Sequence, residues 1–167
     1  MKMTSAQAAK LLRRLKEELA TLQSREYDTS TFTVSPGEDI ELIRPQYDYT
    51  EMKAQMEEVE TKIRKLKHIL NVFNSTTIVP EFNMTIDEIL VYIPQLSKRY
   101  STLSTMKNTL PIQRETPSGM RGIIEYTYAN YDVELAKKDF DEVSERLAKA
   151  QTALDYVNST VEMEVDI

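Results

Sequence analysis

The chain has 167 residues, of which 27 are acidic, 21 are basic, one is histidine and none is cysteine. This length suits one domain, so residues 1–167 are expected to fold around a single hydrophobic core. The lack of cysteine excludes a disulfide framework and thiolate chemistry, and one histidine excludes a zinc site built from several histidines. A net charge of −6 argues against a nucleic-acid or anionic-membrane surface, because both require a basic excess.

The sequence predicts neither a targeting segment nor a membrane span. Lys10, Arg13 and Arg14 follow the first residues too closely for an apolar signal core to form. The longest apolar run, Ile89–Ile93, is far shorter than the ~20 residues that cross a bilayer. We therefore expect a soluble cytoplasmic protein.

Four stretches have the apolar spacing of amphipathic helices. The first spans about residues 5–24, with Ser5 as its predicted N-cap. The third opens with a capping box between Thr85 and Glu88, with Met84 placed as a hydrophobic staple, and contains Pro94, where we expect a kink. The predicted stripes of the first and third helices are Ala8, Leu12, Leu15, Leu19 and Leu22, and Ile86, Ile89, Ile93, Leu96, Tyr100 and Leu103.

The second and fourth helices keep a 3-4 spacing over eight stripe positions each, which is a sustained heptad pattern. Their stripes are Tyr49, Met52, Met56, Val59, Ile63, Leu66, Leu70 and Phe73, and Val133, Ala136, Phe140, Val143, Leu147, Ala150, Leu154 and Val157. This pattern is typical of coiled-coil packing, in which helices cross at a shallow left-handed angle.

Short strands are predicted between the helices and after the last one. One hairpin is expected from residues 31–34 and 40–43 around the turn Ser35-Pro36-Gly37. A second is expected from residues 110–114 and 123–128, with a longer turn over 116–122. In the tail, Val161, Met163, Val165 and Ile167 alternate with acidic residues, which predicts a half-buried strand.

A shift of 84 residues superimposes the second helix on the fourth without a gap. Ten of the thirty positions in 47–76 are identical to those in 131–160, whereas ordinary residue frequencies give about two. The matches include Tyr-Asp at the start and Asn-Ser-Thr at the end, which lie outside the heptad pattern. We infer an internal duplication with pseudo-repeats at 5–84 and 85–167, related by a pseudo-two-fold axis. The expected fold is mainly α, with long antiparallel helical hairpins in a four-helix bundle and short β-hairpins.

The chain resembles an uncharacterised family of small bacterial helical proteins with a corynebacterial type member, some of which carry the label septicolysin. The resemblance rests on residues 70–74 (Leu-Asn-Val-Phe-Asn), on Thr77, and on residues 85–90 (Thr-Ile-Asp-Glu-Ile-Leu). Ile124, Tyr126, Asp132 and Val133 also match the family's strand before its last helix, although this chain has one extra residue there. Its hairpin turn, through Pro117 and Gly119, is also longer than the family's. The resemblance implies a helical, oligomeric bacterial protein, and it brings no activity, catalytic residue or cofactor.

Asn71, Asn74 and Asn158 are the candidate site residues. Asparagine is a good C-cap, since it adopts the left-handed conformation readily, and both repeats have Asn-Ser-Thr at the same place. We therefore favour capping at Asn74 and Asn158, and the alternative is a polar pocket that the two repeats share. No catalytic residue, metal or cofactor is predicted.

Other polar residues have simpler interpretations than a functional site. His68 falls at an outward heptad position and is expected to be solvated rather than catalytic or metal-binding. Glu162, Glu164 and Asp166 share one strand face and could hold calcium, although charges that keep an edge strand from pairing explain them better. Six tyrosines are expected to form an interface or the rim of the core: Tyr47, Tyr49, Tyr92, Tyr126, Tyr128 and Tyr131.

The leading functional hypothesis is a non-enzymatic protein of interaction or assembly that associates with itself, most simply through dimers. Apolar side chains outside the helical stripes and on the hairpin would be left exposed on a monomer: Ile69, Val72, Val91, Tyr92, Tyr126 and Tyr128. One alternative is a membrane-active protein, which the septicolysin label suggests and the acidic outer helix faces oppose. Another is a helical arm that binds nucleic acid, which the negative charge opposes.

Overall fold

A computed structural model of the chain describes residues 1–115 and 124–167. The helices in this described part are α1 (Ser5–Thr29), α2 (Ile40–Ile43), α3 (Tyr49–Thr76), α4 (Ile86–Met106) and α5 (Val133–Thr160). The strands are β1 (Lys2–Thr4), β2 (Ile78–Val79), β3 (Met84–Thr85), β4 (Ile112–Arg114), β5 (Tyr126–Tyr128) and β6 (Glu162–Glu164). The chain is therefore mainly helical, with short antiparallel strand pairs.

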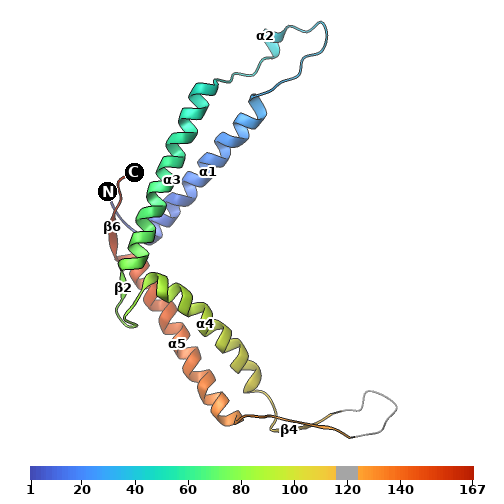
Figure 1. Cartoon of the computed structure of the whole chain (residues 1–167), viewed down its shortest axis with the longest axis vertical. Helices are drawn as coiled ribbons and strands as arrows, with labels where there is room; N and C mark the ends of the chain where they lie inside the picture. Colours follow the sequence, from blue (N-terminus) through green and yellow to red (C-terminus); the bar gives the residue numbers. More distant parts are fainter. Residues whose placement is uncertain (116–123) are drawn as a thin grey trace. The chain divides into compact units, whose positions relative to one another are not determined.

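The chain divides into two compact units. Unit 1 consists of residues 1–76 and 158–167, and unit 2 consists of residues 77–157. Each unit contains one helical hairpin, α1 with α3 in unit 1 and α4 with α5 in unit 2 (Figure 1). This division has a physical reason, because each hairpin buries its two apolar stripes against each other.

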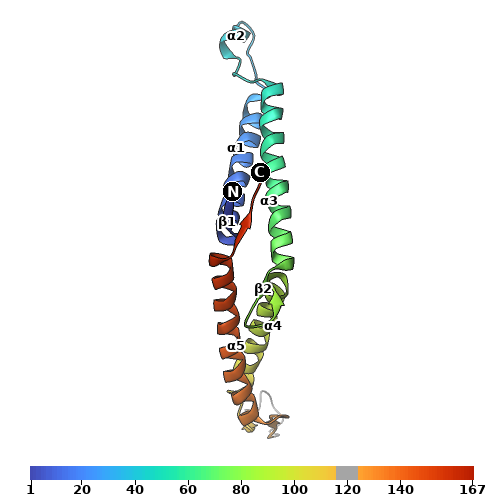
Figure 2. The ribbon, with the colours of Figure 1, turned by 90° about the vertical axis from the view of Figure 1, so that its left-hand side faces the viewer.

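In unit 1, α1 and α3 run side by side along most of their length (Figures 1 and 2). The α3 stripe is largely buried as predicted, and Leu66 is completely inaccessible to solvent. Tyr49, the first predicted stripe position, is instead exposed. The N-cap of α1 is Thr4 and not Ser5, because the Thr4 side chain accepts a hydrogen bond from the Gln7 amide and completes a capping box.

In unit 2, the core lies between α4 and α5. Leu103 and Ala136 are buried beside Phe140, whose ring centroid lies 4.8 Å from that of Tyr100. The Tyr131 hydroxyl donates a hydrogen bond of 2.9 Å to the Met106 carbonyl oxygen, which connects the end of α4 to the start of α5. At the opposite end of α4, Thr85 and Glu88 form the capping box that the sequence predicts.

Three two-stranded antiparallel pairs accompany the helices. The predicted tail strand is β6, in which Met163 is buried, and Val165 just beyond it is buried too. Its partner is β1, which the sequence analysis did not predict, and the Met1 amino group extends the pair by donating to the Val165 carbonyl oxygen at 2.7 Å. The second predicted hairpin is present as β4–β5, and its turn over 116–122 lies outside the described residues.

The first predicted hairpin, over residues 31–34 and 40–43, is wrong. Residues 31–35 have no regular structure, and residues 40–43 form the short helix α2. The Asp39 side chain caps this helix by accepting a hydrogen bond from the Glu41 amide at 2.9 Å. An apolar pattern of four residues fits one helical turn as well as a strand, so the cap decides between them.

The strand pairs of the two units have the same register. In unit 1, Thr4 faces Glu162 and Met3 faces Met163, while in unit 2, Thr85 faces Ile78 and Met84 faces Val79. The 84-residue shift relates Glu162 to Ile78 and Met163 to Val79, and it also relates both ends of α5 to those of α3. A Met-Thr strand that leads directly into a capping box therefore occurs once in each unit.

Candidate functional site

The three candidate asparagines all belong to unit 1 and lie within the last turns of helices. Asn71 and Asn74 are on α3, which continues to Thr76, and Asn158 is on α5, which continues to Thr160. Asn83 is the one non-glycine residue with a positive φ in the part of the chain that the structure describes. Asn74 and Asn158 therefore lack the left-handed conformation of a C-cap, and each lies two residues before its helix ends.

Asn158 forms a contact that the sequence analysis did not foresee. The Ser5 hydroxyl donates to the Asn158 side-chain oxygen Oδ1 at 2.7 Å and also lies 3.2 Å from the Asn158 carbonyl oxygen. Ser5 is buried, so this hydrogen bond connects the start of α1 to the end of α5 away from bulk water. Because Thr4 is the N-cap of α1, the Ser5 side chain is available for this contact.

The equivalent position in unit 2 cannot make the same contact. Ile86 follows the capping Thr85 as Ser5 follows Thr4, and it is a buried hydrocarbon with no hydroxyl to donate. Asn74, the counterpart of Asn158, therefore has no donor from this position. The Asn-Ser-Thr ends match in sequence, but their surroundings differ in chemistry.

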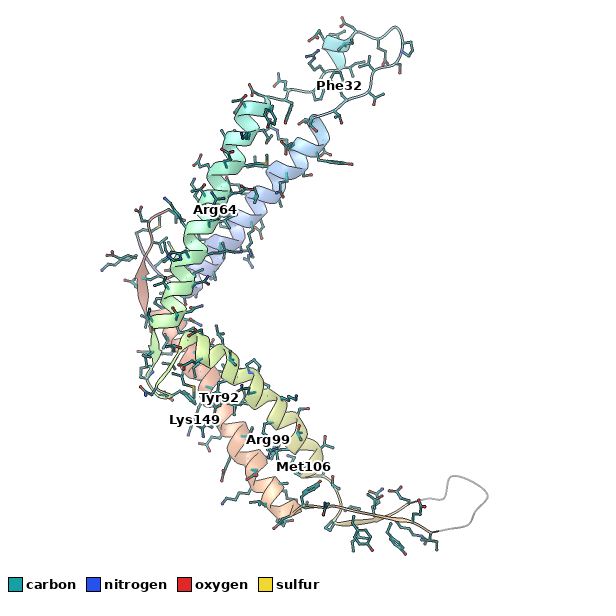
Figure 3. All side chains as sticks on the ribbon, viewed as in Figure 1. Phe32, Arg64, Tyr92, Arg99, Met106 and Lys149 are labelled. Carbon is teal, nitrogen blue, oxygen red and sulfur yellow. The ribbon has the colours of Figure 1, made fainter. Side chains whose placement is uncertain are left out.

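Unit 2 contains an open hollow of about 630 Å³ on the face that α5 turns to solvent, beside the β2–β3 turn. Its lining consists of Glu81, Phe82, Glu142, Glu145, Arg146 and Lys149. Two of these side chains contact Tyr92 of α4: the Phe82 ring lies 6.2 Å away between centroids, and Arg146 Cζ lies 5.6 Å above the Tyr92 ring. Tyr92 on α4 and Lys149 on α5 are labelled in Figure 3.

Ion pairing within the chain accounts for the strongest charge contact in this hollow. Lys149 Nζ lies 2.6 Å from Glu145 Oε1, and this hydrogen bond lowers the pKa of Glu145 and raises the pKa of Lys149. Both groups therefore stay charged across the neutral range. The hollow therefore presents a solvated ion pair on its surface.

The two faces of the β4–β5 hairpin differ in composition. Ile112, Arg114, Tyr126 and Tyr128 alternate along the two strands and therefore share a face, and Leu110 and Ile124 flank the strands. The five apolar side chains of this set are each between 49% and 64% exposed. Gln113, Glu115 and Thr127 point to the opposite face, where the Thr127 hydroxyl donates to a Glu115 carboxylate oxygen at 2.6 Å. The sequence predicts the two tyrosines as interface residues, and the even-numbered spacing also marks Leu110, Ile112 and Ile124, which that prediction omits.

Exposed apolar side chains also occur in the connection between α1 and α3 and on the helices. In the connection, Leu42 is 85% exposed, and Phe32 (Figure 3) lies under the Arg44 guanidinium at 5.9 Å. Among the flanking residues named above, Val72 and Val91 are exposed, whereas Ile69 and Tyr92 are half-buried. Leu90, next to Val91 on α4, adds to the apolar surface.

The alternative polar sites find little support in the geometry. His68 is exposed on α3, as expected. Within residues 1–115 and 124–167, no group of three acidic, histidine or cysteine side chains is placed to hold a metal ion, so the tail carboxylates Glu162, Glu164 and Asp166 do not form one. No helix in the described part of the chain is both long and apolar enough to cross a membrane.

The tyrosines do not act as one group. Tyr47 donates a hydrogen bond of 3.3 Å to Glu26, and partial desolvation, followed by the nearby Glu26 charge, raises the pKa of its hydroxyl. Tyr131 and Tyr92 pack within unit 2, as described above, whereas Tyr126 and Tyr128 present their rings to solvent. The exposed pair on β5 is therefore the part of this set that is available to a partner.

No protein-family model and no curated protein matches the chain. Among solved structures, the chain is similar to a functionally unknown conserved protein from Corynebacterium diphtheriae, with 20% sequence identity and a TM-score of 0.59. The similarity covers 98% of this chain and 100% of that protein's chain. It is consistent with the resemblance to an uncharacterised corynebacterial family, and at this identity it shows a shared fold alone.

Proposed function

We propose that the chain is a non-enzymatic assembly protein that associates with itself, with a dimer as the basic unit. The observation that carries the proposal is the group of apolar side chains on the β4–β5 hairpin, five of which are each about half or more exposed. Contiguous apolar patches of this kind are uncommon on soluble monomers and mark interaction surfaces. A closed two-fold interface is the commonest way in which soluble proteins cover such a patch.

Apolar residues on the helices support the same proposal. Leu90 and Val91 are exposed on α4, and Val72 is exposed on α3, outside the stripes that each hairpin buries. A hairpin that packs on another hairpin must present such a second apolar face. These residues therefore also support the four-helix bundle and the coiled-coil packing that the heptad pattern predicts.

The internal duplication belongs to this proposal as well. It is supported by the common register of β1–β6 and β2–β3, by the equal lengths of α3 and α5, and by the paired capping boxes at Thr4 and Thr85. The strand before each capping box pairs with the strand that follows the 28-residue helix of the other half: β1 pairs with β6, and β3 pairs with β2. Two fused copies arranged in this way would form a pseudo-dimer within one chain. Association of two chains would again pair like with like.

The test of self-association is light scattering coupled to size-exclusion chromatography over a hundredfold dilution. We expect a mass of twice the 19.3 kDa chain or a larger even multiple, which persists at about 1 M salt because an apolar interface is not screened. A single species at the chain mass at every concentration would contradict the proposal. A dimer that dissociates only at high salt would instead indicate an interface of charges.

A membrane-active protein, as the septicolysin label suggests, is the second candidate. The observation in its favour is the apolar connection between α1 and α3, in which Leu42 is 85% exposed with Ile40 and Ile43 beside it. Dye release from anionic liposomes tests it, with Leu42→Ser as the matched variant. Leakage at micromolar wild-type protein that Leu42→Ser abolishes would favour this candidate over assembly. The nucleic-acid arm remains the least favoured, since the net charge of −6 opposes it.

A further inference from the structure

We propose that the outer edge of β5 pairs with the β5 edge of a second copy of this chain, in an antiparallel register centred on Thr127. This inference rests on the proposed self-association and names the surface that performs it. The four strands would then form one continuous sheet in the order β4, β5, β5 of the second copy, β4 of the second copy.

The backbone hydrogen bonds of the hairpin show which amide and carbonyl groups of β5 point toward its outer edge. The Glu115 amide donates to the Glu125 carbonyl oxygen at 2.9 Å and the Ala129 amide donates to the Pro111 carbonyl oxygen at 3.0 Å, so the odd-numbered residues direct their backbone groups into the hairpin. Successive residues of an antiparallel strand alternate in this respect. The amide and carbonyl groups of Tyr126 and Tyr128 therefore point outward, along an edge with no strand partner in the described part of the chain.

A two-fold antiparallel pairing centred on one residue places the residue before it opposite the residue after it in the second copy. Because β5 reads Tyr126-Thr127-Tyr128, such a pairing brings side chains of the same type together. With Thr127 on the axis, Tyr126 faces Tyr128 of the second copy, Tyr128 faces Tyr126, and the four outward amides find four outward carbonyl groups. The side-chain pairs that result are aromatic with aromatic and Thr with Thr, which are among the stabilising cross-strand pairs.

The charges on the hairpin favour this edge over that of β4. None of the three residues of β5 is charged, and Glu125, which precedes β5, would face Ala129 of the second copy. On β4, Arg114 is itself a ladder residue, and a charged side chain on an edge strand opposes pairing. The β5 edge is therefore the one suited to a partner.

The stability of the hairpin provides a further argument. A two-stranded sheet whose six ladder residues are all exposed is marginal in water by itself, and three or more strands with an apolar face are needed for independent stability. Pairing would extend the sheet to four strands and bring Tyr126 and Tyr128 of both copies onto one face, together with Ile112 and Arg114. The four tyrosine rings would then lie beside one another rather than isolated in solvent.

The first test uses the absence of cysteine from the chain. In the proposed register, Thr127 and its symmetry mate form a non-hydrogen-bonded pair with Cβ atoms ~4.5 Å apart, close to the separation in a disulfide. We expect Thr127→Cys to convert to a disulfide dimer on mild oxidation at micromolar protein. The matched control is Gln113→Cys, its cross-strand neighbour on the same face, which would lie three strand spacings from its mate, ~14 Å, and remain monomeric on a non-reducing gel.

The second test removes one outward amide with proline. Tyr128→Pro deletes an amide that faces the proposed partner and leaves the hairpin ladder intact, so the dimer mass should fall to 19.3 kDa with unchanged helical circular dichroism. The matched control is Ile112→Pro, which deletes the outward amide of the facing residue on β4 and should leave the dimer intact.

The outcomes distinguish this inference from the proposed function. A wild-type dimer that persists in Tyr128→Pro, together with Thr127→Cys cross-linking no better than Gln113→Cys, would overturn the β5 pairing and leave self-association standing. A wild-type chain at 19.3 kDa throughout the dilution series would overturn both. If Tyr128→Pro loses helical signal, the cross-linking comparison alone decides, because it leaves every backbone amide in place.

Discussion

The two compact units differ most where their helices connect. In the first, residues 30–48 form an irregular connection with the single turn α2, while in the second, the connection between α4 and α5 contains the paired strands β4 and β5. The other parts are alike: both units have a Met-Thr strand, a capping box, a long helix of 28 residues and a second strand. The helix ends are therefore built in the same way in the two units, whereas the connections between the helices differ in structure.

A second difference lies inside the hairpins. Phe140 of α5 is buried against Leu103 and Tyr100, whereas its counterpart under the 84-residue shift, Met56 of α3, is half-buried. Leu66 of α3 and its counterpart Ala150 of α5 are both fully buried. The two units therefore have their larger buried side chains at different positions along the helix. Truncation of Phe140 and of Met56 in turn tests this difference.

The largest effect is expected from Phe140→Ala. Removal of this ring leaves a cavity between α4 and α5, and the free energy of unfolding should fall by about 3–4 kcal/mol. The matched variant Met56→Ala, at the equivalent position, should lose about 2 kcal/mol, because Met56 is less buried. Urea unfolding followed by circular dichroism measures both, and equal losses would contradict the inequality between the repeats.

The next effect concerns the Ser5–Asn158 hydrogen bond. Asn158→Ala should lower the free energy of unfolding by about 1–2 kcal/mol, because it leaves the buried Ser5 hydroxyl without its shorter hydrogen bond. Asn74→Ala should cost less, since Ile86 offers no hydroxyl there. A double-mutant cycle of Ser5→Ala with Asn158→Ala isolates the contact, and additive losses would show that the two side chains do not interact.

The capping boxes should behave alike in the two repeats. Thr4→Ala and Thr85→Ala each remove the side chain that accepts the amide of N3, and each should cost about 1 kcal/mol. Thr4→Ser and Thr85→Ser preserve the acceptor and serve as controls that should retain most of the stability. A loss confined to one of the two boxes would weaken the structural equivalence of the repeats.

The smallest effect is expected from the exposed ion pairs Glu58–Lys62 and Glu145–Lys149, both at 2.6 Å. Each carboxyl pKa is lowered from 4.5, so its stabilisation is present above that pH and is lost as the pH falls through the lower value in the folded state. Each lysine pKa is raised from 10.5, so its stabilisation is present below that pH and is lost as the pH rises through the raised value.

Melting temperature as a function of pH measures this effect. The melting temperatures of the wild type and of the double variant Lys62→Met, Lys149→Met should differ slightly between these pH limits. They should converge below the folded-state pKa of the glutamates. A difference that is unchanged at about pH 2 would mean that the methionines act through packing and not through lost charge pairs.

Much of the fold follows from local patterns. The heptad spacing of α3 and α5 predicts which side chains are buried, because a 3-4 repeat places them on one face of a helix. The capping box at Thr85, the tail strand and the β4–β5 hairpin are similarly encoded within a few neighbouring residues. The two local patterns that failed are short: the apolar turn at residues 40–43, and the cap of α1, which lies at Thr4 and not at Ser5.

The candidate site depended on information that local patterns do not contain. A shift of 84 residues aligns Asn74 with Asn158, but it does not show that Asn158 finds the Ser5 hydroxyl, which is 153 positions away in the chain. The Ser5–Asn158 hydrogen bond depends on the pairing of β1 with β6, which brings the start of α1 to the end of α5. The strand β1 has only 3 residues, too few for an alternating pattern to be recognised in the sequence.

By itself, therefore, the sequence determined the helices and their buried stripes, because period, caps and composition act over a few residues. The tertiary structure alone decided that the N-terminal strand joins the C-terminal one and that each helical hairpin belongs to its own compact unit. It also decided which backbone amide and carbonyl groups of β5 point outward, because the residues on either side of them form the hydrogen bonds to β4. These features arise from contacts between segments far apart in the chain, and no local periodicity specifies such contacts.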